Sequence, residues 1–96
     1  MAYLTLLAKI TAKAGCEDKL LPELQAMVQP SNAEAGCLKY VLHRHPEDAR
    51  TFWFVEEWED QAALDEHNQT PHYKRLKERT ADLVENAELT KLHPIT

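Results

Sequence analysis

The residues best able to do chemistry gather between Glu56 and Tyr73. This stretch contains a carboxylate, an indole, two imidazoles and a phenol, carried by Glu56, Trp58, His67, His72 and Tyr73. An imidazole titrates near neutrality and can accept a proton from a phenol. An indole can stack on a flat aromatic ring. The stretch is therefore typical of a site that binds an aromatic molecule and moves a proton.

Each of these residues also has a structural interpretation. Trp58 and His67 fit a hydrophobic core as well as a binding site, provided the imidazole finds a hydrogen-bond partner. A buried carboxylate at Glu56 must be paired or hydrogen-bonded, and it can hold an imidazole or a phenol. His72 falls in the first turn of a predicted helix, where the helix dipole disfavours its charged form. A surface position at that helix end is the alternative.

The first half of the chain predicts a strand, a helix and a second strand. Residues 2–12 alternate, with Leu4, Leu6, Ala8 and Ile10 on one face and Tyr3, Thr5, Leu7 and Lys9 on the other. We expect Gly15 to end this strand and a helix to run from about Asp18 to Val28, broken by Pro30-Ser31-Asn32. Gly36 is expected to supply a permissive dihedral before a strand over residues 37–45, with Leu38, Tyr40 and Leu42 on one face.

The second half predicts a strand, a broken helix and a last strand. Residues 46–49 form a turn, and the strand from Thr51 to Trp58 places Phe52, Phe54, Glu56 and Trp58 on one side. Asp60 is expected to cap a short helix ending near Asn68, and Thr70-Pro71 to start another whose apolar stripe reaches Ala87. Residues 88–92 form the last strand. The order β-α-β-β-α-β predicts one ferredoxin-like α+β domain over residues 1–96, with helices on one face of an antiparallel sheet.

Composition limits the partners. A net charge of −5 with no basic cluster argues against nucleic acid. Neither a signal peptide nor a membrane span is expected. Cys16 and Cys37 have no close spacing and predict reduced thiols of a cytoplasmic protein. Apolar residues on both faces of the strands predict a homodimer, because helices can cover only one face.

No cofactor is predicted. The chain lacks G-x-G-x-x-G, a Walker sequence and G-x-S-x-G. His43 and His45 share a strand face, but no third ligand accompanies them at a suitable spacing. We therefore expect neither a metal nor a flavin.

Residues spread over nearly the whole chain resemble the antibiotic biosynthesis monooxygenase family. They are the opening strand, Gly15, Gly36-Cys37-Leu38-x-Tyr40, Glu56-x-Trp58, His67 and Pro71-His72-Tyr73. The resemblance implies a dimeric α/β-barrel protein with a cavity between sheet and helices in each subunit. It implies that Tyr40, Phe54, Glu56, Trp58, His67, His72 and Tyr73 line this cavity.

The activity implied by the resemblance is cofactor-independent oxidation of a hydroquinone-like aromatic molecule to a quinone by O₂. His67 or His72 would be the base and Glu56 would assist it. The substrate would contact Trp58, Tyr40, Phe54 and Tyr73.

The sequence leaves two other hypotheses open and argues against a third. One is isomerisation of a phosphorylated ketone of the autoinducer-2 type, which needs cations near the cavity; Lys9, Lys39 and Arg44 are the candidates. Another is a non-catalytic dimeric binding or stress-response module. Haem-degrading relatives fit poorly, because this chain has Ala8 and Lys77 where they have an asparagine and a histidine ligand.

Overall fold

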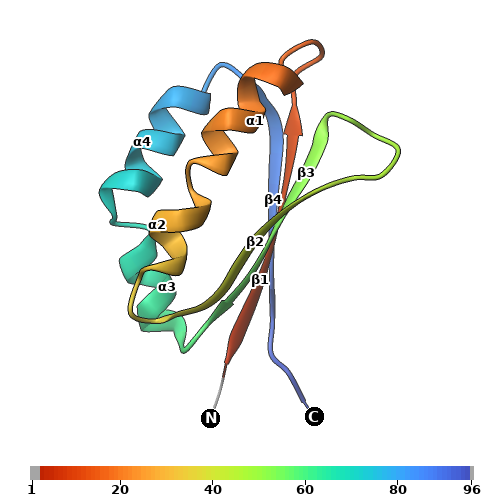
Figure 1. Ribbon diagram of the computed structural model, residues 1–96. Helices are drawn as coiled ribbons and strands as arrows, with labels where there is room; N and C mark the ends of the chain where they lie inside the picture. The colour runs from red at the N-terminus through yellow and green to blue at the C-terminus, as the bar shows by residue number, and fades with distance from the viewer. Residues whose placement is uncertain (1–2, 96) are drawn as a thin grey trace.

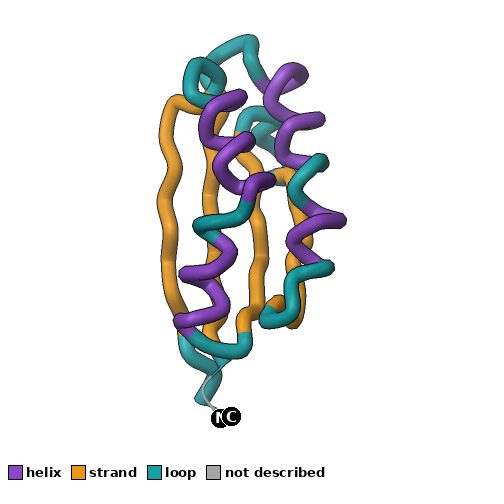
Figure 2. The backbone as a smooth tube through the Cα atoms, turned by 90° about the vertical axis from the view of Figure 1, so that its left-hand side faces the viewer, coloured by secondary structure: helices purple, strands orange, loops and turns teal. Residues whose placement is uncertain are grey.

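The chain folds into two layers, an open antiparallel sheet and a layer of helices covering one of its faces (Figures 1 and 2). The computed structural model describes residues 3–95. Its elements in chain order are β1 (Leu4–Ala12), α1 (Glu17–Gln25), α2 (Val28–Asn32), β2 (Cys37–Arg44), β3 (Thr51–Trp58), α3 (Gln61–His67), α4 (Pro71–Thr80) and β4 (Val84–Leu92). The strand order β2-β3-β1-β4 confirms the ferredoxin-like prediction. The sheet of the single chain does not close into a barrel.

The alternating pattern of β1 and β3 builds the centre of the sheet. The two strands pair antiparallel, with Leu4 opposite Trp58 and Ala8 opposite Phe54. The buried residues of the two strands lie on the same side of the sheet, as the period of two predicts. They are Leu4, Leu6 and Ala8 of β1 and Phe52, Phe54, Glu56 and Trp58 of β3. The core lies between this side and the helices.

The first helical segment differs from the prediction at its end. α1 begins at Glu17 as expected, but Pro22 lies in its second turn and the helix ends soon afterwards at Gln25. The chain then restarts as α2, which contains the residues expected to break the helix. Pro30 is tolerated because it is the third residue of α2, where a backbone N–H has no partner within the helix.

Gly36 is required for a different reason from the one expected. Among the described residues only Gly15 has a positive φ, of 82°. A Cβ atom at Gly36 would collide with the Cβ of Ala63 in α3, so the glycine permits close packing instead. The pairing of β2 with β3 is irregular between Cys37 and Lys39. As a result Leu38 is exposed, contrary to the prediction, and Cys37 packs against the core.

The last strand begins earlier than predicted. α4 ends at Thr80, and residues from Val84 onwards pair with β1. The predicted helical stripe up to Ala87 was therefore wrong. Val84 and Ala87 fit a helical period, but pairing with β1 supplies backbone hydrogen bonds that a local pattern does not reveal.

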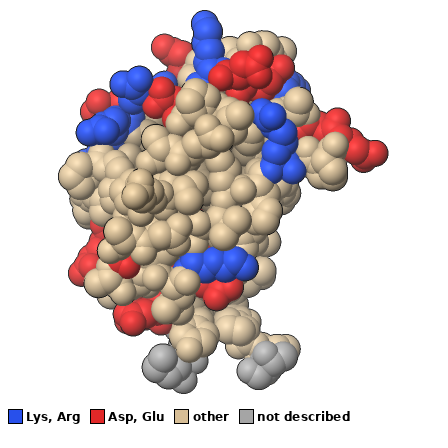
Figure 3. Space-filling view, viewed as in Figure 1, with Lys and Arg blue, Asp and Glu red and all other residues tan. Residues whose placement is uncertain are grey.

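Two features of the molecule concern membranes and surface charge. No helix within residues 3–95 is long and apolar enough to cross a membrane. On the face shown in Figure 3, basic and acidic side chains are interspersed around an uncharged central area. That face offers no continuous basic surface for a phosphate backbone.

Candidate functional site

A cavity of about 680 Å³ opens between the inner face of the sheet and helices α3 and α4. Its wall includes residues from all four strands, from α3 and α4, and Leu24 of α1. Most of the wall is apolar, and the polar groups Tyr40, Glu56, His67 and Tyr73 are among its lining residues. This size and this lining are typical of a small-molecule site.

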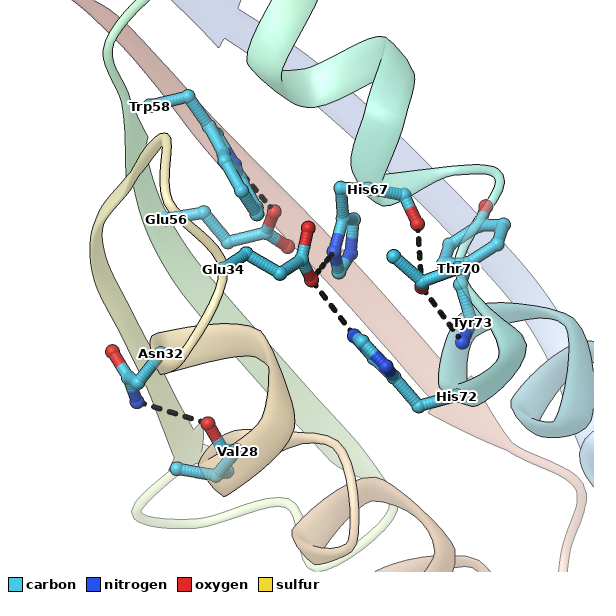
Figure 4. A network of polar contacts seen from close by, with 9 residues as sticks. All are labelled: Val28, Asn32, Glu34, Glu56, Trp58, His67, Thr70, His72 and Tyr73. Atoms are coloured by element: carbon cyan, nitrogen blue, oxygen red, sulfur yellow. Dashed lines mark hydrogen bonds and ion pairs between the residues drawn. The ribbon is translucent and has the colours of Figure 1, made fainter.

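One carboxylate oxygen joins two histidines beside the cavity. Oε2 of Glu34 lies 2.7 Å from Nδ1 of His67 and 2.7 Å from Nε2 of His72 (Figure 4). An ionised carboxylate only accepts hydrogen bonds, so each of these ring nitrogens donates a hydrogen to it. Neutral His67 then carries its hydrogen on Nδ1, and its Nε2 is left with a free lone pair.

Local capping places the two imidazoles. Asp60 accepts from the backbone N–H of Ala63 and starts α3, of which His67 is the last residue. The hydroxyl of Thr70 donates to the carbonyl of His67 and accepts from the backbone N–H of Tyr73. Thr70 thereby caps the start of α4. His72 follows Pro71 in that first turn. The predicted caps at Asp60 and Thr70 are confirmed, and together they fix the two histidines at one corner.

Glu34 lies in the turn between α2 and β2. Its backbone N–H donates to the carbonyl of Ser31, and its carbonyl accepts from Cys37. These bonds hold the turn over the corner where α3 meets α4. No periodic pattern marks this residue in the sequence, and the site prediction missed it; a lone acid between two alanines before Gly36 was the only signal.

Glu56 and Trp58 form a second polar pair on the inner face of β3. Nε1 of Trp58 donates to Oε1 of Glu56 over 3.0 Å. Burial raises the pKa of Glu56 to about 7, while the Trp58 hydrogen bond lowers it and the Glu34 charge raises it. A carboxyl group with a pKa in this range can take up or release a proton near neutral pH.

The neighbouring groups are held mainly in their neutral forms. Burial lowers the pKa of His67, against the opposing effect of the Glu34 carboxylate. Burial and the nearby Glu56 charge raise the pKa of both Tyr40 and Tyr73. The ring of His67 lies 5.5 Å from that of Tyr40 and 5.3 Å from that of Tyr73, measured between centroids. A neutral imidazole among neutral phenols can accept a proton.

The structure brings most of the predicted site residues into the cavity wall. Tyr40, Phe54, Glu56, His67 and Tyr73 line it. Trp58 and His72 do not line it, contrary to the expectation. Trp58 is fully buried, with its ring centroid 4.6 Å from that of His67, so it packs against the imidazole instead of facing the cavity. His72 contacts the site through its hydrogen bond with Glu34 and through its ring, whose centroid lies 5.9 Å from that of His67.

The histidines considered as metal ligands in the sequence are His43 and His45. Nδ1 of His45 accepts from the backbone N–H groups of Glu47 and Asp48, each at 3.0 Å, and so caps a turn. Among residues 3–95, the set of potential metal ligands brought together is Glu34, His67 and His72, whose ligand atoms lie within 4.8 Å of one another.

The cations proposed for a phosphate lie elsewhere. Lys9 pairs with Glu88, Lys39 pairs with Glu57, and Arg44 lies over the ring of Phe52. None of the three lines the cavity. Its lysines are instead Lys77 of α4 and Lys91 of β4, both exposed at the edge.

The fold is shared with several known proteins. The chain aligns with a crystal structure of PA3566 from Pseudomonas aeruginosa at a TM-score of 0.97 and 41% identity, covering 100% of this chain and 97% of that one. A structure of Rv0793 from Mycobacterium tuberculosis gives a TM-score of 0.90 at 27% identity, covering 98% and 96%.

Curated relatives are also similar in sequence. A Bacillus subtilis protein named "Putative monooxygenase YcnE" is 33% identical over 84% of this chain and 85% of its own length. A Synechocystis protein, sll1783, is 30% identical over 90% of this chain, which spans 58% of that longer protein. The family model for antibiotic biosynthesis monooxygenases matches residues 3–79. The chain therefore belongs to the antibiotic biosynthesis monooxygenase family.

Proposed function

We propose that this protein is a cofactor-independent monooxygenase that oxidises a hydroquinone-like aromatic molecule to a quinone. The observation that carries the proposal is His67, a buried imidazole in the wall of the cavity whose Nδ1 hydrogen is held by Glu34. A carboxylate that orients an imidazole in this way leaves the second ring nitrogen ready to accept a proton.

The reaction needs no external reductant. Nε2 of His67 removes a phenolic proton, and the resulting phenolate is an electron-rich donor for O₂. One oxygen atom enters the ring, the other leaves as water, and the ring supplies all four electrons, so a hydroquinone yields a hydroxyquinone. The apolar part of the wall keeps bulk water from the intermediates.

Glu56 is the proposed second proton acceptor. It lines the cavity, and its pKa of about 7 lets it take up or release a proton near neutrality. Tyr40, Phe54 and Tyr73 are the proposed contacts of the aromatic ring. Trp58 and His72 would position other site residues: Trp58 by its hydrogen bond to Glu56 and His72 by its hydrogen bond to Glu34.

The proposed working unit is a homodimer formed through the outer face of the sheet. Within residues 3–95 the helices all lie on the inner face of the sheet (Figure 1). On the outer face Tyr3, Val41 and Leu92 are exposed, and Leu7, Trp53 and Val55 are partly buried. A row of apolar groups without a covering layer is suited to pairing with a second copy.

A second candidate function is isomerisation of a phosphorylated ketone. Lys77 and Lys91 at the edge of the cavity favour it, because they offer positive charge to a phosphate. The base would be the same His67, which would remove a proton next to the carbonyl.

Oxygen consumption separates the two candidates. Chelator-treated protein is supplied with substituted hydroquinones and naphthohydroquinones, and uptake is followed with an oxygen electrode. We expect substrate-dependent uptake that is lost in His67→Ala. Conversion of a phosphorylated ketone without oxygen uptake would favour the isomerase instead.

A further inference from the structure

The corner between α3 and α4 combines a carboxylate and two imidazoles around one point. Oε2 of Glu34 lies 2.7 Å from a ring nitrogen of His67 and 2.7 Å from one of His72. Glu34 comes from the turn before β2, so three separate segments converge here. We infer that this cluster is also a binding site for a divalent metal ion of the zinc type, which switches the proposed catalytic base off.

The chemical set suits such an ion. Two histidines and one glutamate form a recurrent zinc site whose fourth position is taken by water. In a tetrahedral zinc site with bonds of about 2.0–2.1 Å, the ligand atoms are about 3.3 Å apart. The two Glu34 contacts must therefore lengthen by roughly half an ångström, and the two imidazole nitrogens, which lie within 4.8 Å of one another, must reach the same separation. The glutamate side chain can adjust by rotating, since it lies in a turn and retains 14% exposure, and the partly exposed ring of His72 can move toward His67.

The cluster is reachable from solvent on one side and closed on the other. The side chain of His72 is 20% exposed, whereas that of His67 is only 3% exposed. His67 is backed by the rings of Trp58 and Tyr73, at centroid distances of 4.6 and 5.3 Å. An ion entering past His72 would meet a wall that holds the ring of His67 in place. A fixed ligand orientation of this kind strengthens metal binding.

Metal binding and base catalysis exclude each other through the tautomer of His67. In the metal-free cluster Nδ1 carries the hydrogen and Nε2 has the free lone pair. A metal ion on Nδ1 requires that this N–H bond breaks, and a proton from solvent then occupies Nε2 of the neutral ring. The nitrogen that would accept the phenolic proton is blocked. This inhibition rests on the proposed function, whereas the binding itself does not.

The binding is tested by titrating chelator-treated protein with Zn²⁺ in a calorimeter and with Co²⁺ in a spectrophotometer. We expect one ion per chain and a visible Co²⁺ spectrum of low coordination number. Glu34→Gln and His72→Asn should each weaken binding at least tenfold. His43→Asn is the matched control, because this exposed histidine lies on β2 and belongs to no ligand cluster within residues 3–95. Circular dichroism checks that each variant is folded.

The outcomes separate the metal site from the catalytic proposal. Absence of one-to-one binding, or binding that survives both Glu34→Gln and His72→Asn, would overturn the metal site. Binding at this cluster without loss of oxygen uptake would keep the site but contradict the switch and the role of His67 as base. If no hydroquinone is oxidised at all, the calorimetric comparison of variants still decides whether the ion binds.

Discussion

The indole N–H of Trp58 donates a hydrogen bond to Oε1 of Glu56, two residues earlier on the same strand. Both side chains are buried, at 0% and 3% exposure. The bond supplies the partner that a buried carboxylate requires, and it opposes the effect of burial on the pKa of Glu56. Trp58 thus moderates the pKa of a cavity residue without lining the cavity itself.

Trp58→Phe should destabilise the fold by about 2–4 kcal/mol, because it leaves a cavity and removes the donor to Glu56. Urea unfolding followed by circular dichroism measures the change. A loss well below about 1 kcal/mol would contradict both the cavity and the contribution of the bond to Glu56.

Glu56 should make stability depend on pH in a defined direction. Its pKa is raised from 4.5 to about 7 on folding, so the folded state holds the proton more tightly. The corresponding stabilisation is complete below pH 4.5 and is lost as the pH rises through about 7. The difference in unfolding free energy between wild type and Glu56→Gln should therefore fall over this range, by up to about 3 kcal/mol. A difference that rises with pH would contradict the shift.

His67→Ala should slow oxidation by about a hundredfold or more, the usual worth of a general base. Glu34→Gln should slow it by about tenfold, since the amide can donate to Nδ1 and favour the wrong tautomer. His72 does not line the cavity, so His72→Ala should have the smallest effect on kcat. Steady-state kinetics measures the order of the three effects. An effect of His72→Ala larger than that of His67→Ala would exchange the two roles.

The outer face should mediate association. Val41→Glu places a charge on an exposed apolar position of β2 and should convert the proposed dimer to an 11.0 kDa monomer. Ala62→Glu, on the exposed surface of α3, is the control and should leave the dimer intact. Sedimentation velocity at micromolar concentration distinguishes the two species. A wild-type protein that sediments as a monomer would refute the dimer.

Gly36→Ala should destabilise the fold by about 1–3 kcal/mol, because its new methyl group meets Ala63. Ala63→Gly should restore part of the loss in the double variant. Gly15→Ala has open space around it but a φ of 82°, so it should cost about 1 kcal/mol through backbone strain. Ala63→Gly should not rescue that variant. Unfolding experiments on this set distinguish packing from strain.

Local chemistry in the sequence determined much of this fold. The alternation in residues 4–12 and 51–58 predicted the central strands, because side chains on a strand face opposite sides in turn. Asp60 and Thr70 marked both helix starts, because their side chains accept hydrogen bonds from nearby backbone. The alternation in residues 51–58 also placed Phe54 and Glu56 on the side where the cavity lies.

Tertiary structure alone decided the features that depend on residues far apart in the chain. Glu34 meets His67 and His72 across 33 and 38 residues, a relationship with no periodicity to reveal it. Pairing with β1 made residues from Val84 a strand, although their spacing also suits a helix. Close packing on α3 explains Gly36. A sequence pattern reports the face on which a residue lies, whereas contacts between elements depend on how those elements pack together.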